Sequence, residues 1–113
     1  MQNRNKIIDL FAANIATAVV HEILEEAIDD ENLRKHYDKE FQNSFSIAKK
    51  YRENLNPIDR PLPTEDQDQI KDKIIAKVKN ELSLRIKKGY NNVDLNKVES
   101  YTKKMLGKLK ILQ

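Results

Sequence analysis

The segment IIDLFAANIATAVV, residues 7–20, constrains the fold most, because it is apolar around nearly its whole helical circumference. An ordinary surface helix carries a single apolar stripe, whereas a helix that is apolar all round is buried, either at the centre of a bundle or between subunits. We expect this helix near residues 4–29. From His21 onward its pattern becomes amphipathic, so only its first two-thirds requires cover on every side.

A second helix is expected near residues 31–55. Seven apolar side chains fall within one arc of its helical wheel: Leu33, Tyr37, Phe41, Phe45, Ala48, Tyr51 and Leu55. The following NPIDRPLP, residues 56–63, contains all three prolines of the chain and cannot continue a helix.

The third helix is expected to start at Thr64, because Thr64 and Gln67 have the spacing of a capping box. Lys87, Lys88 and Gly89 should end it, with glycine free to adopt the left-handed backbone that closes many helices. A fourth helix is expected from Asp94. No segment alternates with the period of a strand, so residues 1–113 are predicted to form one all-α domain, a four-helix bundle, mostly antiparallel, with a Pro-rich crossing between helices two and three.

The first helix also suggests self-association. Ala12 and Ala16 are four residues apart on one face, where a second backbone could approach closely, and Ile8 and Val19 flank them. Three amphipathic partners would leave part of residues 7–20 uncovered, which favours a homodimer using Ile8, Ala12, Ala16 and Val19. The alternative is that the first helix is simply the centre of its own bundle.

The N-terminus superficially resembles a secretory signal, with Arg4 and Lys6 before an apolar run. Asp9 and Asn14 interrupt that run, however, and fourteen interrupted positions fall short of the roughly twenty that a membrane span needs. The chain has no cysteine, which excludes disulfides and thiolate metal sites. We therefore expect a cytoplasmic protein with no membrane partner.

Charge is distributed unevenly along the chain. Residues 1–69 hold nine Lys and Arg against fourteen Asp and Glu, whereas residues 70–113 hold twelve against four. Basic helical faces can bind an acidic protein or the phosphates of a nucleic acid without sequence preference. The residues expected to do so are Lys73, Lys77, Lys97, Lys104 and Lys108. Lysine predominates over arginine and no aromatic residue alternates with these lysines, which argues against specific or single-strand recognition.

The segment HEILEEAIDDE, residues 21–31, raises the question of a metal site. His21 and Glu22 begin a zincin-like H-E-x-x-H in which Glu25 replaces the second histidine, and a hairpin would place His21 level with about Glu40, more than two turns from His36. The spacing therefore predicts no metal site and no cofactor.

Part of the acidic pattern resembles the motifs E-E-x-x-E and E-x-x-D, with which all-α nucleotide pyrophosphohydrolases hold Mg²⁺. The matching residues are Glu22, Glu25, Glu26, Asp29 and, on the second helix, Glu53. Asn56 stands where the second motif has its Asp, so a ligand is missing. The resemblance supports an Mg²⁺-dependent enzyme only as a third hypothesis.

These patterns together favour a small helical protein-interaction or structural module, homodimeric and without a catalytic role. A nucleic-acid-binding protein that uses the basic second half is the alternative.

Overall fold

The computed structural model describes residues 4–55, 62–90, 92–109 and 111, and these contain four helices. They are α1 (Arg4–Ala27), α2 (Glu31–Leu55), α3 (Thr64–Lys87) and α4 (Lys97–Lys108). The all-α prediction is confirmed for the described part of the chain, which has no strand. Most of the predicted Pro-rich crossing, residues 56–61, lies outside the described residues.

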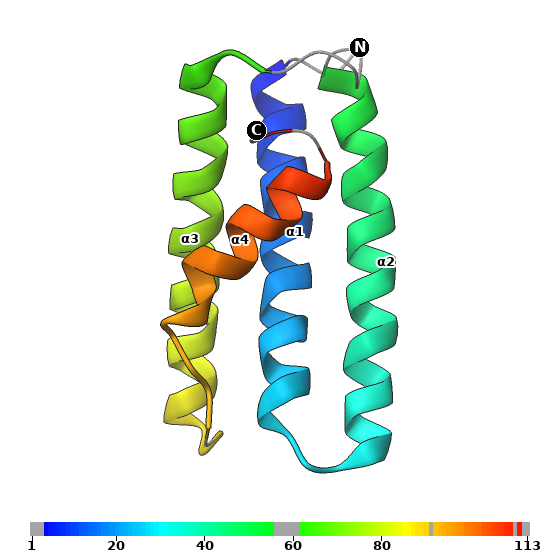
Figure 1. The fold of residues 1–113 in the computed structure, drawn as a ribbon, viewed down its shortest axis with the longest axis vertical. Helices are drawn as coiled ribbons and strands as arrows, with labels where there is room; N and C mark the ends of the chain where they lie inside the picture. Colours follow the sequence, from blue (N-terminus) through cyan, green and yellow to red (C-terminus); the bar gives the residue numbers. More distant parts are fainter. Residues whose placement is uncertain (1–3, 56–61, 91, 110, 112–113) are drawn as a thin grey trace.

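The four helices form a layer of three with a short helix across it. Figure 1 shows α1 in the middle, with α2 on one side and α3 on the other, and α4 crossing α3 and α1 obliquely. At the backbone level α2 packs on α1, while α4 packs on both α1 and α3. In a simple four-helix bundle all four helices run side by side. Here α4 instead crosses α3 and α1 obliquely.

A turn at residues 94–96 precedes α4, so the helix begins later in the sequence than expected. Helix α4 begins at Lys97 and not at Asp94, because residues before it form a turn in which Asp94 Oδ1 accepts a hydrogen bond of 2.9 Å from the Asn96 amide. Asp side chains favour such local bonds over helix continuation. The helix that remains has only 12 residues, half the length of α3.

Helix α1 supplies ten buried residues, more than any other helix in the described chain. The four side chains predicted for self-association are among them: the exposed fraction is 1% for Ile8, 0% for Ala12, 6% for Ala16 and 0% for Val19. This corrects the sequence-based assignment, since other helices of the same chain already cover these side chains. These four side chains therefore offer little open surface to a second copy, and α1 is the centre of its own fold.

By length and composition α1 could also cross a membrane. The core helix of a water-soluble protein passes the same test, and more than half of the most apolar stretch of α1 is buried inside the molecule. The apolar character of α1 therefore establishes no location for the protein.

The sequence predicted where α3 begins and ends, but not the hydrogen bonds at its start. Helix α3 does begin at Thr64, but no side chain caps it. The side-chain amide of Gln67 instead donates a 2.7 Å hydrogen bond from Nε2 to the Leu62 carbonyl. At the other end Gly89 has φ of 103°, and the amides of Gly89 and Tyr90 bond back to the carbonyls of Ile86 and Arg85. This pair of bonds is a Schellman motif, so the predicted role of Gly89 is confirmed.

One polar side chain of α2 bonds to the residue that follows the C-terminus of α4. Arg52 is 0% exposed, and its Nε donates a 2.8 Å hydrogen bond to the Leu109 carbonyl. The aliphatic part of an arginine packs like an apolar residue while its guanidinium satisfies carbonyl oxygens. Arg52 thus holds the end of α4 against α2, although the two helices do not approach at the backbone level.

The two glycines of the chain give a matched test of this backbone geometry. Gly107 lies within α4 and an added Cβ would meet no atom within 4 Å, so Gly107→Ala should raise the free energy of unfolding. The expected gain is about 0.5–1 kcal/mol, because alanine has the higher helix propensity. Gly89→Ala should lower the same quantity by about 1–2 kcal/mol, because its positive φ disfavours L side chains. Urea unfolding followed by circular dichroism measures both, and changes of the same sign would contradict the assigned backbone.

Candidate binding groove between α1 and α3

The acidic side of α1 forms a polar seam with α4. The Lys104 ammonium lies 3.0 Å from Glu22, the Lys97 ammonium lies 2.9 Å from Glu26, and the Tyr101 hydroxyl donates to the Glu26 carboxylate at 2.6 Å. Burial disfavours the charged form of Glu26, but the hydrogen bonds from Tyr101 and Lys97 outweigh it and lower its pKa. The Glu26 hydrogen bond, followed by burial, raises the pKa of Tyr101 to about 12. Two of the carboxylates in the 21–31 segment therefore position α4.

The lysines predicted to bind an acidic partner fall into two places. Lys97 and Lys104 lie in the α4 seam, whereas Lys73 and Lys77 lie beside α1 on the α3 side, where Lys73 pairs with Asp9. Lys77 and Lys108 have no ion-pair partner among the described residues. Three of the five candidate lysines are thus matched by carboxylates of α1.

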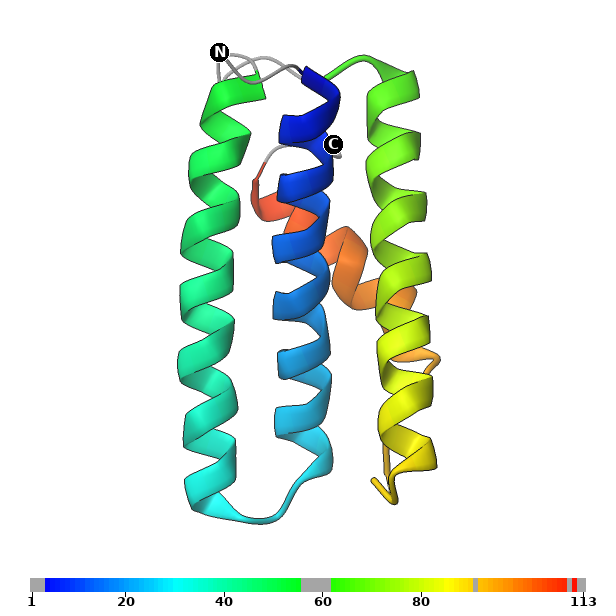
Figure 2. The same ribbon diagram turned by 180° about the vertical axis from the view of Figure 1, so that it is seen from behind.

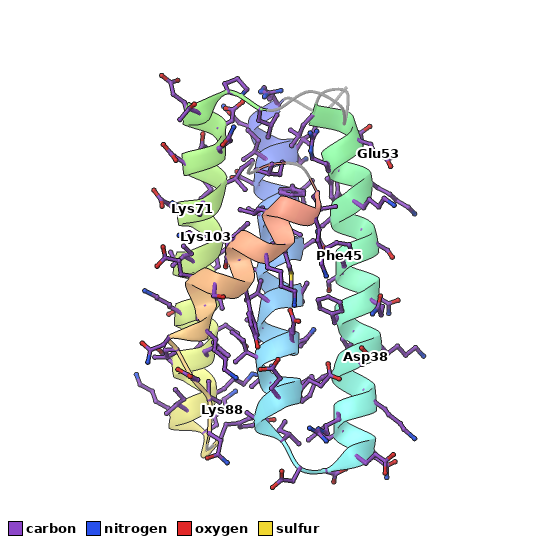
Figure 3. The ribbon with its side chains drawn as sticks, in the orientation of Figure 1. Asp38, Phe45, Glu53, Lys71, Lys88 and Lys103 are labelled. Atoms are coloured by element: carbon purple, nitrogen blue, oxygen red, sulfur yellow. The ribbon has the colours of Figure 1, made fainter. Side chains whose placement is uncertain are left out.

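The carboxylates of the Mg²⁺ hypothesis are not brought together. Glu53 lies near the end of α2, far from the acidic end of α1, and Figure 3 shows it well away from Asp38. With a rise of 1.5 Å per residue, Glu53 and the α2 residues level with Glu22 are about 25 Å apart along the helix axis. The described residues contain no group of three or more acidic or histidine side chains suited to a metal ion. Among the described residues, Glu53 therefore does not join the carboxylates of α1 in one cluster.

The two histidines contact the same aromatic ring. The His21 ring stacks on Tyr37 at 5.5 Å between ring centroids, and His36 lies 5.8 Å from the same ring. Both imidazoles therefore lie beside Tyr37, and the charge of Glu40 also acts on His21.

The side of α1 opposite the seam is not covered by any helix of the described chain. Ala13 and Glu22 are nine residues apart, which places them 180° apart around the helix at 100° per residue. Since Glu22 faces α4, Ala13 faces away from it, and Figure 2 shows α1 on this side flanked only by α2 and α3. Ala13 is half-buried and Thr17 is exposed, in contrast to the fully buried Ala12.

This uncovered side forms a cleft of about 430 Å³ between α1 and α3. Its α1 side consists mainly of small residues, namely Ala13, Ala16, Thr17 and Val20. A second cleft of about 460 Å³, lined by Asp9, Lys73, Ala76 and Lys77, shares Lys77 with the first. We call the two together the α1/α3 groove. It follows α1 from Asp9 to His21, a length of about 18 Å.

Charged and polar side chains of α3 form the other wall of the groove. They are Lys77, Asn80, Glu81 and Arg85. Arg85 Nε donates a 3.1 Å hydrogen bond to Glu81, one turn earlier on the same helix. The guanidinium of Arg85 also lies 5.7 Å from the centroid of the Tyr90 ring, a cation–π distance. Arg85 is thereby held in place, while Lys77 is exposed.

A polar cluster closes the His21 end of the groove. The hydroxyls of Tyr37 and Tyr90 are 3.0 Å apart and bridge α2 to the segment after α3. Burial lowers the pKa of His21, with the positive charge of Arg85 acting in the same direction, although Glu40 opposes both. His21 is therefore a neutral ring at neutral pH, and its Nδ1 is buried without a hydrogen-bond partner in the described chain.

No known family model, curated protein or solved structure matches this chain.

Sequence reasoning identified the correct helix for the groove and one of its residues, Ala16, but not its most open positions. Those positions are Ala13 and Thr17, about 100° round the helix from Ala12 and Ala16. Tyr90 and Asn80 were missed as well. The sequence feature that could have indicated the groove is the pair Lys77 and Glu81, two charged residues one turn apart on the side of α3 that faces α1.

The seam gives a spectroscopic prediction. Tyr101 has a folded-state pKa of about 12 against about 10 when unfolded, so its neutral form stabilises the fold below pH 10 and this contribution is lost as pH rises toward 12. The difference between the tyrosinate absorbance titrations of the wild type and Tyr101→Phe should be a step centred near pH 12. Circular dichroism at each pH verifies that the helices persist. A step centred near pH 10 would show that Tyr101 does not bond to Glu26.

Proposed function

We propose that this chain is a protein-interaction module that binds one helix of a protein partner in the α1/α3 groove. The observation that carries the proposal is the uncovered side of α1, at Ala13 and Thr17, in a helix that is otherwise surrounded by its own chain. A docked helix would cover α1 on its remaining side.

The shape of the groove supports a helical occupant. Helices pack with their axes 8–10 Å apart, and the closest approaches need small side chains at the contact. Ala13, Ala16 and Thr17 provide such side chains on one wall. A length of about 18 Å corresponds to roughly three helical turns, enough for anchors at positions i, i+4 and i+7 of the occupant.

The composition of the groove supports a transient rather than an obligate partner. Apolar positions of α1 lie beside the charged side chains Lys77, Glu81 and Arg85. Interfaces of this mixed kind are typical of proteins that are also stable alone, whereas obligate interfaces resemble a core cut in half. Reversible binding is consistent with a chain whose main apolar surface is already buried when it is alone.

Self-association and nucleic-acid binding have less support. The dimer was expected through Ile8, Ala12, Ala16 and Val19, which are buried within one chain. Nucleic-acid binding would require lysines aligned along one phosphate strand, whereas Lys73, Lys97 and Lys104 are paired with carboxylates at two different places. Releasing each pair would offset part of the gain from contacting a phosphate.

The groove is tested by selecting a display library of amphipathic helical peptides against the immobilised chain. The selected helices should bind the wild type and lose at least about tenfold in affinity to Thr17→Arg, because a long side chain fills the groove. Thr17 is exposed, so this change should leave the fold intact, which circular dichroism verifies. Ser46→Arg, an equally exposed change on α2, is the matched control and should bind as the wild type does.

Three results would overturn the proposal. The first is that no helix is enriched by the selection. The second is that enriched helices bind Thr17→Arg as tightly as they bind the wild type. The third is a concentration-dependent dimer, seen in the mass in solution, that Thr17→Arg dissociates, because a second copy would then occupy the groove.

A further inference from the structure

The charged side chains of the α1/α3 groove indicate which charge a partner should present to it. Two cations, Lys77 and Arg85, and one anion, Glu81, line the cleft that contains Ala13 and Thr17, so the wall of α3 has a net positive charge with His21 neutral. Glu81 is already bonded to Arg85, whereas Lys77 has no acidic partner among the described residues. The groove therefore offers one cation that its own chain leaves unmatched.

Lys77 is placed where an occupant would have to meet it. It is the residue that the two clefts share, and so it lies at the middle of the groove. Lys73, one turn earlier, is paired with Asp9 across the groove, which shows that a lysine of this wall can reach a carboxylate on the facing helix. At the level of Lys77, α1 presents only Ala13, Ala16 and Thr17, none of which can pair with an ammonium group.

Arg85 gives this end of the groove its second cation. Its Nε is bonded to Glu81 and its plane lies over Tyr90, so the side chain is held before any ligand arrives. A guanidinium has five N–H groups and pairs readily with a planar carboxylate. Lys77 and Arg85 are eight residues apart on α3, just over two turns, and both line the same cleft.

We propose that Lys77 and Arg85 bind the carboxylate of an Asp or Glu side chain on the partner helix, whose apolar residues lie on Ala13 and Val20. This inference rests on the proposed function and adds the chemistry of the partner: an amphipathic helix with an acidic residue at the centre of its contact face. The carboxylate sets the register and direction of the helix, since partly exposed ion pairs contribute more to specificity than to affinity.

The site is tested with a small probe that needs no partner helix. Phenylacetate carries a carboxylate on an apolar body, and phenylacetamide is its uncharged counterpart of similar shape. In an NMR titration of the full chain, phenylacetate should shift the amides of residues 13–21 and 77–85 saturably, in the millimolar range. Phenylacetamide should leave them nearly unchanged.

Two lysine variants make the test specific. Lys77→Gln should weaken phenylacetate binding about fivefold, the effect of losing one exposed ion pair. Lys79→Gln removes the same charge two residues along α3, on an exposed position that does not line the groove, and should bind as the wild type does. Equal weakening by both variants, or equal shifts with phenylacetamide, would overturn the proposal.

The same library selection separates this inference from the proposed function. If helices bind and are blocked by Thr17→Arg but carry no acidic residue at an enriched position, and phenylacetate does not bind, the groove takes a helix and the carboxylate site is wrong. If phenylacetate binds as expected while the enriched helices lack acidic residues, the ligand is a free organic carboxylate and not a side chain. If the enriched helices carry a central Asp or Glu, its change to Asn or Gln should cost at least the factor that Lys77→Gln costs, because Arg85 loses its contact as well. Lys77→Gln should then weaken the neutralised helix little further.

Discussion

Burial of α1 is the constraint on which the rest of the structure depends. Its apolar side chains span almost the whole helix circumference, so one neighbouring helix cannot remove them from water. Helices α2, α3 and α4 each pack against α1, and side chains such as Phe11 and Ile15 are fully buried as a result. Each side chain of this kind contributes about 1.5–3 kcal/mol on burial. Since α2 reaches neither α3 nor α4 at the backbone level, the fold holds together through α1.

The uneven charge of the chain has a structural explanation in the same arrangement. The acidic N-terminal half includes α1, and the basic C-terminal half includes α3 and α4, which pack on it. Ion pairs of Lys73, Lys97 and Lys104 with carboxylates of α1 match the two halves within one molecule. Such pairs are individually weak because they are partly exposed, but they determine which faces of α1, α3 and α4 meet. Lys77 remains outside this matching, so the groove carries a positive charge that no described carboxylate pairs with.

Helical periodicity predicted the existence of all four helices, and local signals such as Gly89 predicted where one of them ends. Periodicity could not fix the rotation of α1, because a helix that is apolar on every side has no polar face to orient it. For this reason the sequence pointed to Ala12 and Ala16, whereas the more open positions are Ala13 and Thr17.

Two further differences have local causes. Helix α1 ends at Ala27, two residues before its expected end at residue 29, and Asp30 Oδ1 accepts a hydrogen bond from the backbone amide of Leu33 at the start of α2. Gln67 bonds to Leu62 where a capping box was predicted, because an amide donor can satisfy a carbonyl as readily as it can accept from a backbone amide. The groove could not be predicted from sequence, since it depends on the packing of α4 on one side of α1 and not on the other.

Native-state hydrogen exchange, residue by residue and at two protein concentrations, tests the central position of α1 most directly. If one chain alone buries α1, amides from Ile8 to Leu24 should be the slowest to exchange and should open only with global unfolding, while those of α4 open at lower free energy. These rates should not depend on protein concentration. Fast exchange along α1, or protection of α1 that increases with concentration, would show that a single chain does not bury it.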